Sequence, residues 1–215
     1  MINLKDQEEL FRLIADYLEE DITCICIGGT AMMFMGYKTT TKDIDLVFGS
    51  SQDRQVFIKA LEKLGYTQRS MKTIYDRKRT EAKDKPLLFS RGEERFDLFV
   101  KNIFGFIVDC DLDKIEQKHD FVGKKELITY VLPKELIILL KILTDREKDF
   151  EDIMTIIDKE KNVDWDMIID EAIRQRKNNS WMLLDLKEKL QKLRKTILIK
   201  EKHFKRIYSA EEKYH

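Results

Sequence analysis

Two short stretches of the sequence bring chemically useful groups close together along the chain. Gly28, Gly29 and Thr30 follow a short apolar run, and Asp43 and Asp45 begin the run DIDLVF. Side chains alternate between the two faces of a strand, so the two aspartates point the same way. Carboxylates held together repel each other, and a divalent cation relieves that repulsion. Oxygen-only ligands favour Mg²⁺ or Mn²⁺, which share oxygens with substrate phosphates.

The Gly-Gly-Thr stretch is typical of a tight turn between a strand and a helix. The backbone N–H groups of Gly28 and Gly29 and the Thr30 hydroxyl would then face a phosphate at the positive helix end. An ordinary turn explains this stretch by itself, and an exposed edge strand or a turn cap explains Asp-x-Asp by itself. Together, a phosphate-binding turn and a carboxylate pair are the parts that nucleotide chemistry requires.

Metal-assisted phosphoryl transfer also benefits from a third carboxylate, which holds a second cation and accepts the proton of the attacking hydroxyl. Asp97 is the first candidate, because it faces opposite to Phe96 and Leu98 on a strand-like run. Asp109 is the second candidate, and a surface aspartate is the alternative for either residue.

A lysine within an aliphatic helix is the next candidate for binding an anion. Lys141 lies close to Ile137 and Ile138, where a lone ammonium is costly unless it meets a negative charge. A triphosphate is one such anion, and Asp149 or a backbone carbonyl is another.

These residues resemble the motifs of the nucleotidyltransferase superfamily of the polymerase-beta type, which are a Gly-Gly-Ser/Thr turn, an Asp-x-Asp strand and a third Asp on a later strand. The long gap between Gly29 and Asp43 is similar to that of AbiEii-like abortive-infection toxins and related small prokaryotic nucleotidyltransferases. The Lys, Arg and Lys-Asp-x-x-Asp signature of that group has its counterpart in Lys141, Arg146, Lys148, Asp149 and Asp152.

The resemblance extends from about residue 20 to residue 157 and implies an α+β fold, with a mixed sheet, flanking helices and a helical C-terminal region. It implies Mg²⁺ dependence and transfer of a nucleotide monophosphate from a nucleoside triphosphate such as ATP to a hydroxyl of RNA, tRNA included, or of a protein. It also implies a toxin with an antitoxin partner. The alternative is an inactive module of the same fold that binds nucleotide, RNA or a partner protein. The resemblance assigns catalysis and metal binding to Asp43, Asp45 and Asp97, and nucleotide binding to Gly28, Gly29, Thr30 and Lys141.

The periodicity of apolar residues predicts the elements that position this site. A catalytic domain is expected at 1–132 and a helical region at 133–215, with Pro133 at the start of its first helix. The expected helices are 5–20, 54–66, 134–143, 147–159, 164–177 and 180–207. The expected strands are 22–27, 43–48, 72–76, 85–90, 95–100 and 126–132, with a short helix after Gly29.

Composition narrows the class of protein. The chain has 215 residues, with 40 Lys and Arg against 40 Asp and Glu, so net charge identifies no partner. The end of the chain is basic, which indicates either an RNA contact or a solvated helix surface, and its apolar seam indicates internal packing or a homodimer. No signal peptide or membrane span is evident, so the cytoplasm is expected. The absence of a Walker-type loop or a Ser-His-Asp pattern argues against a P-loop kinase or a hydrolase.

Overall fold

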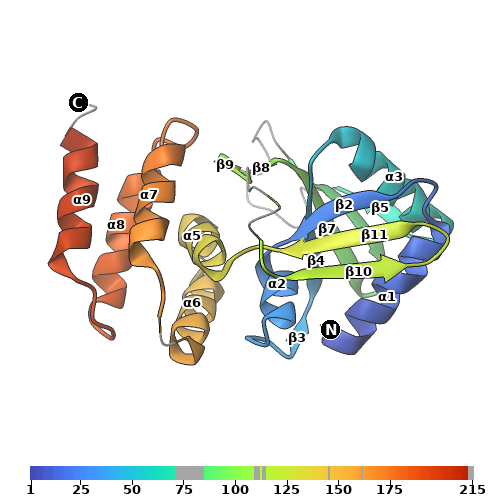
Figure 1. Cartoon of the computed structure of the whole chain (residues 1–215), viewed down its shortest axis with the longest axis horizontal. Coiled ribbons are helices and arrows are strands. Elements are labelled where there is room, and N and C mark those ends of the chain that lie inside the picture. Colours follow the sequence, from blue (N-terminus) through green and yellow to red (C-terminus); the bar gives the residue numbers. More distant parts are fainter. Residues whose placement is uncertain (71–84, 109–111, 113–114, 145, 161, 213–215) are drawn as a thin grey trace. The chain divides into compact units, whose positions relative to one another are not determined.

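The computed structural model describes residues 1–70, 85–108, 112, 115–144, 146–160 and 162–212. By its internal contacts the chain divides into two compact units, Met1–Leu132 and Pro133–His215 (Figure 1). The first contains a mixed sheet with flanking helices, and the described part of the second is helical. The predicted α+β fold class is therefore confirmed.

A mixed sheet forms the centre of the first unit. Its strands follow the order β10-β11-β2-β4-β7-β6-β5, and β8 pairs with β7 and β9. Two neighbouring pairs, β11 with β2 and β4 with β7, are parallel, and the other neighbours along this order are antiparallel. The strands are β2 (Ile22–Cys26), β4 (Asp43–Phe48), β5 (Thr67–Arg69), β6 (Leu87–Arg91), β7 (Glu94–Val100), β8 (Asn102–Ile103), β9 (Phe106–Ile107), β10 (Lys118–Val122) and β11 (Glu126–Val131). A separate ribbon pairs β1 (Ile2–Asn3) with β3 (Thr40–Thr41).

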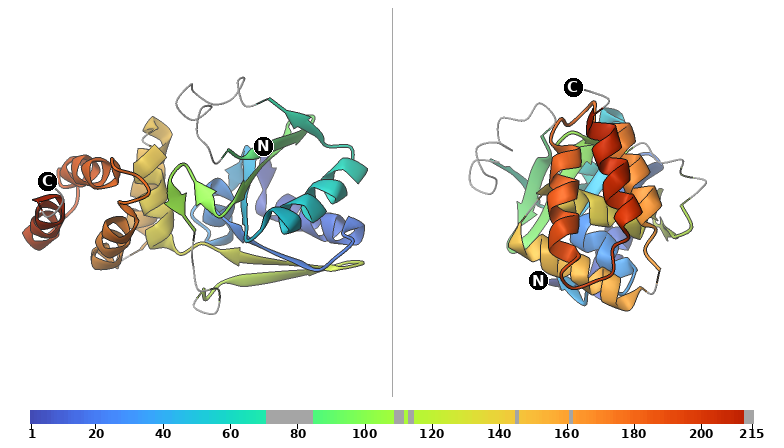
Figure 2. Two further views of the ribbon diagram at one scale, coloured as in Figure 1. Left: turned by 90° about the horizontal axis from the view of Figure 1, so that it is seen from above. Right: turned by 90° about the vertical axis from the view of Figure 1, so that its left-hand side faces the viewer.

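One face of the sheet is apolar and is covered by two helices, α1 (Leu4–Tyr17) and α3 (Ser51–Lys63). Phe57 of α3 lies 5.3 Å from Phe48 and 5.7 Å from Phe96, measured between ring centroids. Phe11 of α1 contacts Phe121 of β10 at 5.2 Å. These aromatic contacts exclude water from this face, and Figure 2 shows both helices beside the strands. The opposite face is therefore the one that carries the polar residues of β4 and β7.

The second unit is built from amphipathic helices. They are α5 (Lys134–Thr144), α6 (Glu147–Lys159), α7 (Trp165–Gln175), α8 (Met182–Leu193) and α9 (Glu201–Glu212). Their apolar residues form a buried core that includes Ile153, Ile156, Ile168, Leu186 and Leu190. Among the described residues of the chain, none of the helices is long and apolar enough to cross a membrane.

The expected helix 180–207 is wrong in one respect, because α8 ends at Leu193 and α9 begins at Glu201. Thr196, Ile197 and Ile199 are β-branched residues, which lose side-chain freedom in a helix. Ile199 is 2% exposed and Leu198 is 89% exposed, so the chain turns here to bury one side chain at the expense of the other.

Four strands of the sheet were not expected, namely the two-residue strands β8 and β9 and the longer strands β5 and β10. Of the five residues of β10 only Phe121 is buried, and the whole of β5 is exposed, so neither strand carries an alternating apolar pattern. Both lie at the edges of the sheet, where one partner strand suffices for pairing. The expected strand 72–76 lies outside the described residues.

Candidate active site

The three aspartates of the predicted site come together on neighbouring strands. In the parallel pairing of β4 with β7, Asp45 is the direct partner of Asp97, and Asp43 is the partner of Arg95. Residues in register share a face of the sheet, so all four side chains lie on the face opposite to α3. Ile44 between the two aspartates is 2% exposed and faces the core. The alternation read from DIDLVF thus occurs in the structure.

The glycine turn lies against one of these carboxylates. Gly28 begins the short helix α2 (Gly28–Phe34) and has a φ of +55°, a conformation that side chains rarely adopt. A Cβ atom at this position would lie 2.5 Å from Oδ2 of Asp45, closer than two such atoms can approach. A Cβ at Gly29 would collide with the Thr41 hydroxyl. The absence of a side chain at Gly28 therefore permits the close approach of the turn to Asp45 of β4, and its absence at Gly29 permits the approach to Thr41 of β3.

Thr30 fixes this turn to β4. The backbone N–H of Asp45 donates a hydrogen bond to Oγ1 of Thr30 at 2.9 Å, and Thr30 is fully buried. The N–H of Ile27 donates to the carbonyl of Asp45 at 3.1 Å. The Thr30 hydroxyl thus positions the Asp45 backbone in this structure, and its contact with a phosphate remains a prediction.

Arg95 lies among the carboxylates and was not expected there. Its Nη2 is 2.5 Å from Oδ2 of Asp43, and its Nε donates to Oδ1 of Asp97 at 2.9 Å. The Asp97 side chain is 1% exposed, whereas those of Asp43 and Arg95 are 31% and 23% exposed. A guanidinium therefore bridges the outer and the buried carboxylate. The sequence signal was available, because Arg95 is two residues from Asp97 and must share its face.

The donor chemistry of Asp43, Asp45 and Asp97 suits a hard divalent cation, since every side-chain donor is an oxygen. Within the described part of the chain, however, no group of three His, Cys, Asp or Glu residues has the arrangement of a metal site. In this structure the guanidinium of Arg95 holds oxygens of two carboxylates that a cation would need. Ligation of Mg²⁺ or Mn²⁺ by these aspartates therefore requires Arg95 to turn away. The other candidate, Asp109, lies outside the described residues.

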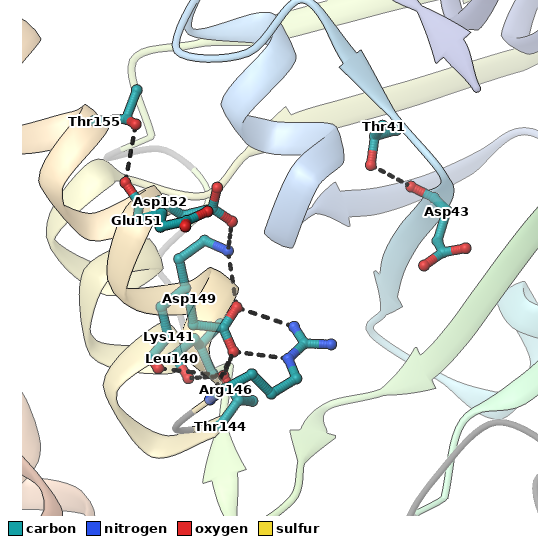
Figure 3. A network of polar contacts seen from close by, with 10 residues as sticks. All are labelled: Thr41, Asp43, Leu140, Lys141, Thr144, Arg146, Asp149, Glu151, Asp152 and Thr155. Atoms are coloured by element: carbon teal, nitrogen blue, oxygen red, sulfur yellow. Dashed lines mark hydrogen bonds and ion pairs between the residues drawn. The ribbon is translucent and has the colours of Figure 1, made fainter.

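Lys141 belongs to a buried ionic network within the second unit, drawn in Figure 3. Its Nζ lies 2.5 Å from Oδ2 of Asp152 and 3.3 Å from Oδ1 of Asp149. Arg146 donates to both oxygens of Asp149, at 2.7 and 3.0 Å, and the Thr144 hydroxyl donates to Oδ2 at 2.6 Å. Of the anions considered for Lys141, a carboxylate of its own unit is thus the one that the structure provides.

The network strongly favours the ionised form of Asp149. Burial alone would raise the pKa of this carboxyl group, but the hydrogen bond from Arg146 and the charge of Lys141 outweigh burial. Together with the Thr144 hydroxyl they hold the Asp149 pKa well below its ordinary value. The carboxylate therefore stays charged although its side chain is 1% exposed.

Comparison with known proteins adds no identification. No protein-family model matches the sequence, and no curated protein matches it significantly.

Proposed function

We propose that the chain is a divalent-metal-dependent nucleotidyltransferase. In this reaction an acceptor hydroxyl oxygen forms a bond to the α-phosphorus of a nucleoside triphosphate. The bond from that phosphorus to the β-phosphate oxygen breaks, pyrophosphate leaves with its electron pair, and the hydroxyl proton passes to a carboxylate. The chemistry needs positioned phosphates, charge neutralisation and a base, rather than a covalent intermediate.

The observation that carries the proposal is the convergence of three carboxylates with a glycine turn. Asp45 is the strand partner of Asp97, and its carboxylate lies against Gly28, where a side chain would not fit. Because Gly28 and Gly29 have no side chains, the backbone N–H groups of the turn can approach phosphate oxygens beside the carboxylates. The resemblance to polymerase-beta-type nucleotidyltransferases rests on these same residues.

The roles follow from the position of each side chain. Asp43 and Asp45 would hold Mg²⁺ or Mn²⁺, and a bound cation would neutralise phosphate charge during transfer. Asp97 is the most buried of the three and would complete the ligand set and accept the hydroxyl proton. Gly28 and Gly29 would bind the triphosphate through their backbone N–H groups.

A transfer assay tests the proposal. The native chain is incubated with each labelled nucleoside triphosphate, Mg²⁺, and either total tRNA or a protein mixture. We expect transfer of the label to one acceptor class and its loss in Asp45→Asn, which keeps the shape of the side chain. Asp120→Asn is the matched control, because Asp120 is an exposed carboxylate of β10 paired with Lys118. Absence of transfer by the native chain, or equal transfer by Asp45→Asn, contradicts the proposal.

A non-catalytic module of the same fold is the second candidate, and one observation favours it. Arg95 already neutralises two of the three carboxylates, as a permanent internal cation would. This alternative predicts that nucleotide binding, measured by thermal stabilisation, survives Asp45→Asn and does not depend on Mg²⁺. Metal-dependent stabilisation that disappears in Asp45→Asn favours the enzyme.

The resemblance also implies that the protein acts as a toxin with an antitoxin partner in the cytoplasm. We expect its production in a bacterial host to arrest growth, and Asp45→Asn to restore growth at equal protein level. Normal growth with active native protein contradicts the toxin role while leaving the transferase proposal intact.

A further inference from the structure

A cavity adjoins the carboxylates on the polar face of the sheet. Its volume is about 630 Å³, and the residues of its wall that bear on its chemistry are Lys42, Asp43, Arg69, Ser90, Glu94 and Arg95. Pockets that hold a small molecule or one nucleotide have volumes of about 300–1,000 Å³. The cavity is therefore large enough for a nucleotide unit placed beside Asp43.

The strand register builds the floor of this cavity. Asp43 of β4 is the partner of Arg95 of β7, and Arg95 is the partner of Ser90 of β6. Arg69 of the edge strand β5 donates from Nε to Oγ of Ser90 at 2.7 Å. These four side chains form a row across four neighbouring strands, with the carboxylate of Asp43 on β4 at one end and the guanidinium of Arg69 on β5 at the other.

Two cations on the cavity wall are available for an anionic ligand. Within the described ranges, no carboxylate lies within ion-pair distance of Lys42 or Arg69, and both residues are exposed. The acidic residues of the wall have partners of their own. Glu94 accepts hydrogen bonds from Tyr66 at 2.5 Å and from Arg91 at 3.0 Å, and the exposed Glu93 lies 3.8 Å from the N-terminal amine.

The order of the strands separates this cavity from the glycine turn. The turn at Gly28 follows β2, and the sheet continues from β2 through β4 and β7 to β6 and β5. The carboxylates of β4 and β7 therefore lie between the turn on one side and Arg69 on the other. Transfer of a phosphoryl group requires the attacking and leaving oxygens on opposite sides of the phosphorus, which this order provides.

We propose that the cavity holds the acceptor strand of an RNA, with Lys42 and Arg69 contacting the phosphate next to the reacting hydroxyl. The inference rests on the proposed nucleotidyltransferase function, which requires an acceptor, and the two cations favour RNA as that acceptor. A polypeptide acceptor offers no regularly spaced anion for such a pair, whereas every nucleotide of RNA carries one. The hydrogen bond to Ser90 holds Arg69 at the cavity wall.

The salt dependence of RNA binding tests this inference directly. The probe is a fluorescein-labelled single-stranded RNA of 12 nucleotides, and its anisotropy is measured with the full-length chain at several salt concentrations. For each phosphate that the protein no longer neutralises, the slope of log affinity against log salt decreases by about 0.7. We expect this decrease for Lys42→Gln and for Arg69→Gln, and about twice this decrease for the double variant.

A matched control separates these phosphate contacts from the general charge of the protein. Lys59→Gln removes one positive charge from α3, on the apolar side of the sheet, where Lys59 lies 3.7 Å from Glu19. We expect its slope to equal that of the native chain. The affinity for a nucleoside triphosphate with Mg²⁺ should be native in both cavity variants, because the donor belongs on the Gly28 side.

Three results overturn the inference. The first is an unchanged slope in both cavity variants and in the double charge reversal, Lys42→Glu with Arg69→Glu. The second is a loss of triphosphate affinity in the cavity variants, which would make the cavity the donor site. The third is transfer of the label to protein alone. If the predicted slopes appear while the native chain transfers no nucleotide, the RNA site stands and the transferase function fails.

Discussion

The two units each contain a cluster of aspartates bound by basic side chains, and the clusters differ in their access to solvent. In the second unit the side chains of Lys141, Asp149 and Asp152 are 7%, 1% and 8% exposed. In the first unit Asp43 is 31% exposed and Arg95 23%, and a cavity opens beside them. The cluster of the second unit is buried, and the cluster of the first unit is partly open to solvent.

Geometry within the clusters points the same way. Asp149 receives hydrogen bonds from Thr144, Arg146 and Lys141, so its two oxygens are engaged by groups of its own unit. Removing one partner of such a buried network is costly, although replacing the whole network with well-packed apolar groups often costs little. A motif of charged residues is therefore informative about function only once the solvent accessibility of its side chains is known. In the sequence alone, the Lys-Asp-x-x-Asp signature and the Asp-x-Asp strand are equally good candidates for a catalytic or binding site.

Loss of Lys141 should give the largest effect on stability. Lys141→Met leaves two buried carboxylates without their shared ammonium, and breaking such a buried pair costs about 3–5 kcal/mol. Urea unfolding of the full chain can be followed by tryptophan fluorescence, because both Trp165 and Trp181 belong to the second unit. A stable variant that loses triphosphate binding would instead assign Lys141 to the nucleotide and contradict a purely structural role for the network.

Adding Asp152→Leu to Lys141→Met provides the control for that measurement. The double variant removes one of the two stranded charges and should recover part of the lost free energy of unfolding. A further loss of stability in the double variant would contradict the buried-network interpretation.

Removal of Arg95 should lower the free energy of unfolding by a smaller amount, and a bound divalent cation should restore that loss. Arg95→Met takes charged hydrogen bonds from the buried Asp97, a loss of about 1.5–3 kcal/mol in the free energy of unfolding. Mn²⁺ should then bind more tightly than to the native chain, because the guanidinium no longer competes for the carboxylates. At 100 times its dissociation constant the ion adds about 2.7 kcal/mol of stability. Thermal melting followed by circular dichroism, together with Mn²⁺ electron paramagnetic resonance, measures both effects.

The matched variant for this experiment is Arg54→Met, which removes a guanidinium from α3 that donates to the backbone carbonyl of Leu98. We expect no gain in Mn²⁺ affinity from it. Equal Mn²⁺ affinity of the native chain and Arg95→Met would show that Arg95 does not occupy a cation site.

Acid should weaken the second unit through Asp149. Its folded pKa is depressed, so the stability that it contributes is complete above the unfolded value of about 3.9 and is lost as the pH falls below that value. In Asp149→Asn the tryptophan-detected stability should depend less on pH in this acidic range. Burial lowers the pKa of His203, so its protonation destabilises the folded state as the pH falls below about 6.5. This effect begins at a higher pH than that of Asp149, so the two can be separated in the pH profile. An unchanged acid profile in Asp149→Asn contradicts the assignment.

Arg146 should matter least, since its side chain is 60% exposed. Arg146→Gln keeps a hydrogen-bond donor and removes a charge that solvent partly screens, so we expect a loss near the lower end of the range of about 1.5–3 kcal/mol for hydrogen bonds to charged groups. The urea midpoint of the tryptophan signal should therefore move much less than in Lys141→Met. A shift as large as that of Lys141→Met would mean that the exposed guanidinium stabilises the Asp149 carboxylate as much as the buried ammonium of Lys141 does.

The site was predictable where strand alternation decides the geometry. DIDLVF places Asp43 and Asp45 on one face, and RFDLFV places Asp97 opposite to Phe96, because a strand has only two faces. Which strands become neighbours is decided by the whole sheet, so the exact pairing of Asp45 with Asp97 required the structure. The same limit hid the Arg95 bridge to Asp43, which joins two separate strands.

The fold was predictable where apolar residues recur and not where they are absent. The buried strands β2, β4 and β7 and the helix α3 carry continuous or periodic apolar patterns. The edge strand β10 has one buried residue, so the sheet and not local pattern determines its conformation. The division between α8 and α9 likewise depends on burying Ile199, a tertiary requirement that helical periodicity does not contain.

The close approach of Gly28 to Asp45 has a genetic consequence. An alanine at position 28 would collide with the carboxylate of residue 45, so an Asp45→Ala change in the same gene should relieve most of the folding defect of Gly28→Ala. The left-handed backbone would still cost about 1 kcal/mol, and relief would therefore be incomplete. A selection for restored soluble protein, run on a library of second changes, should thus recover shortened residues at position 45, and every such revertant should lack transfer.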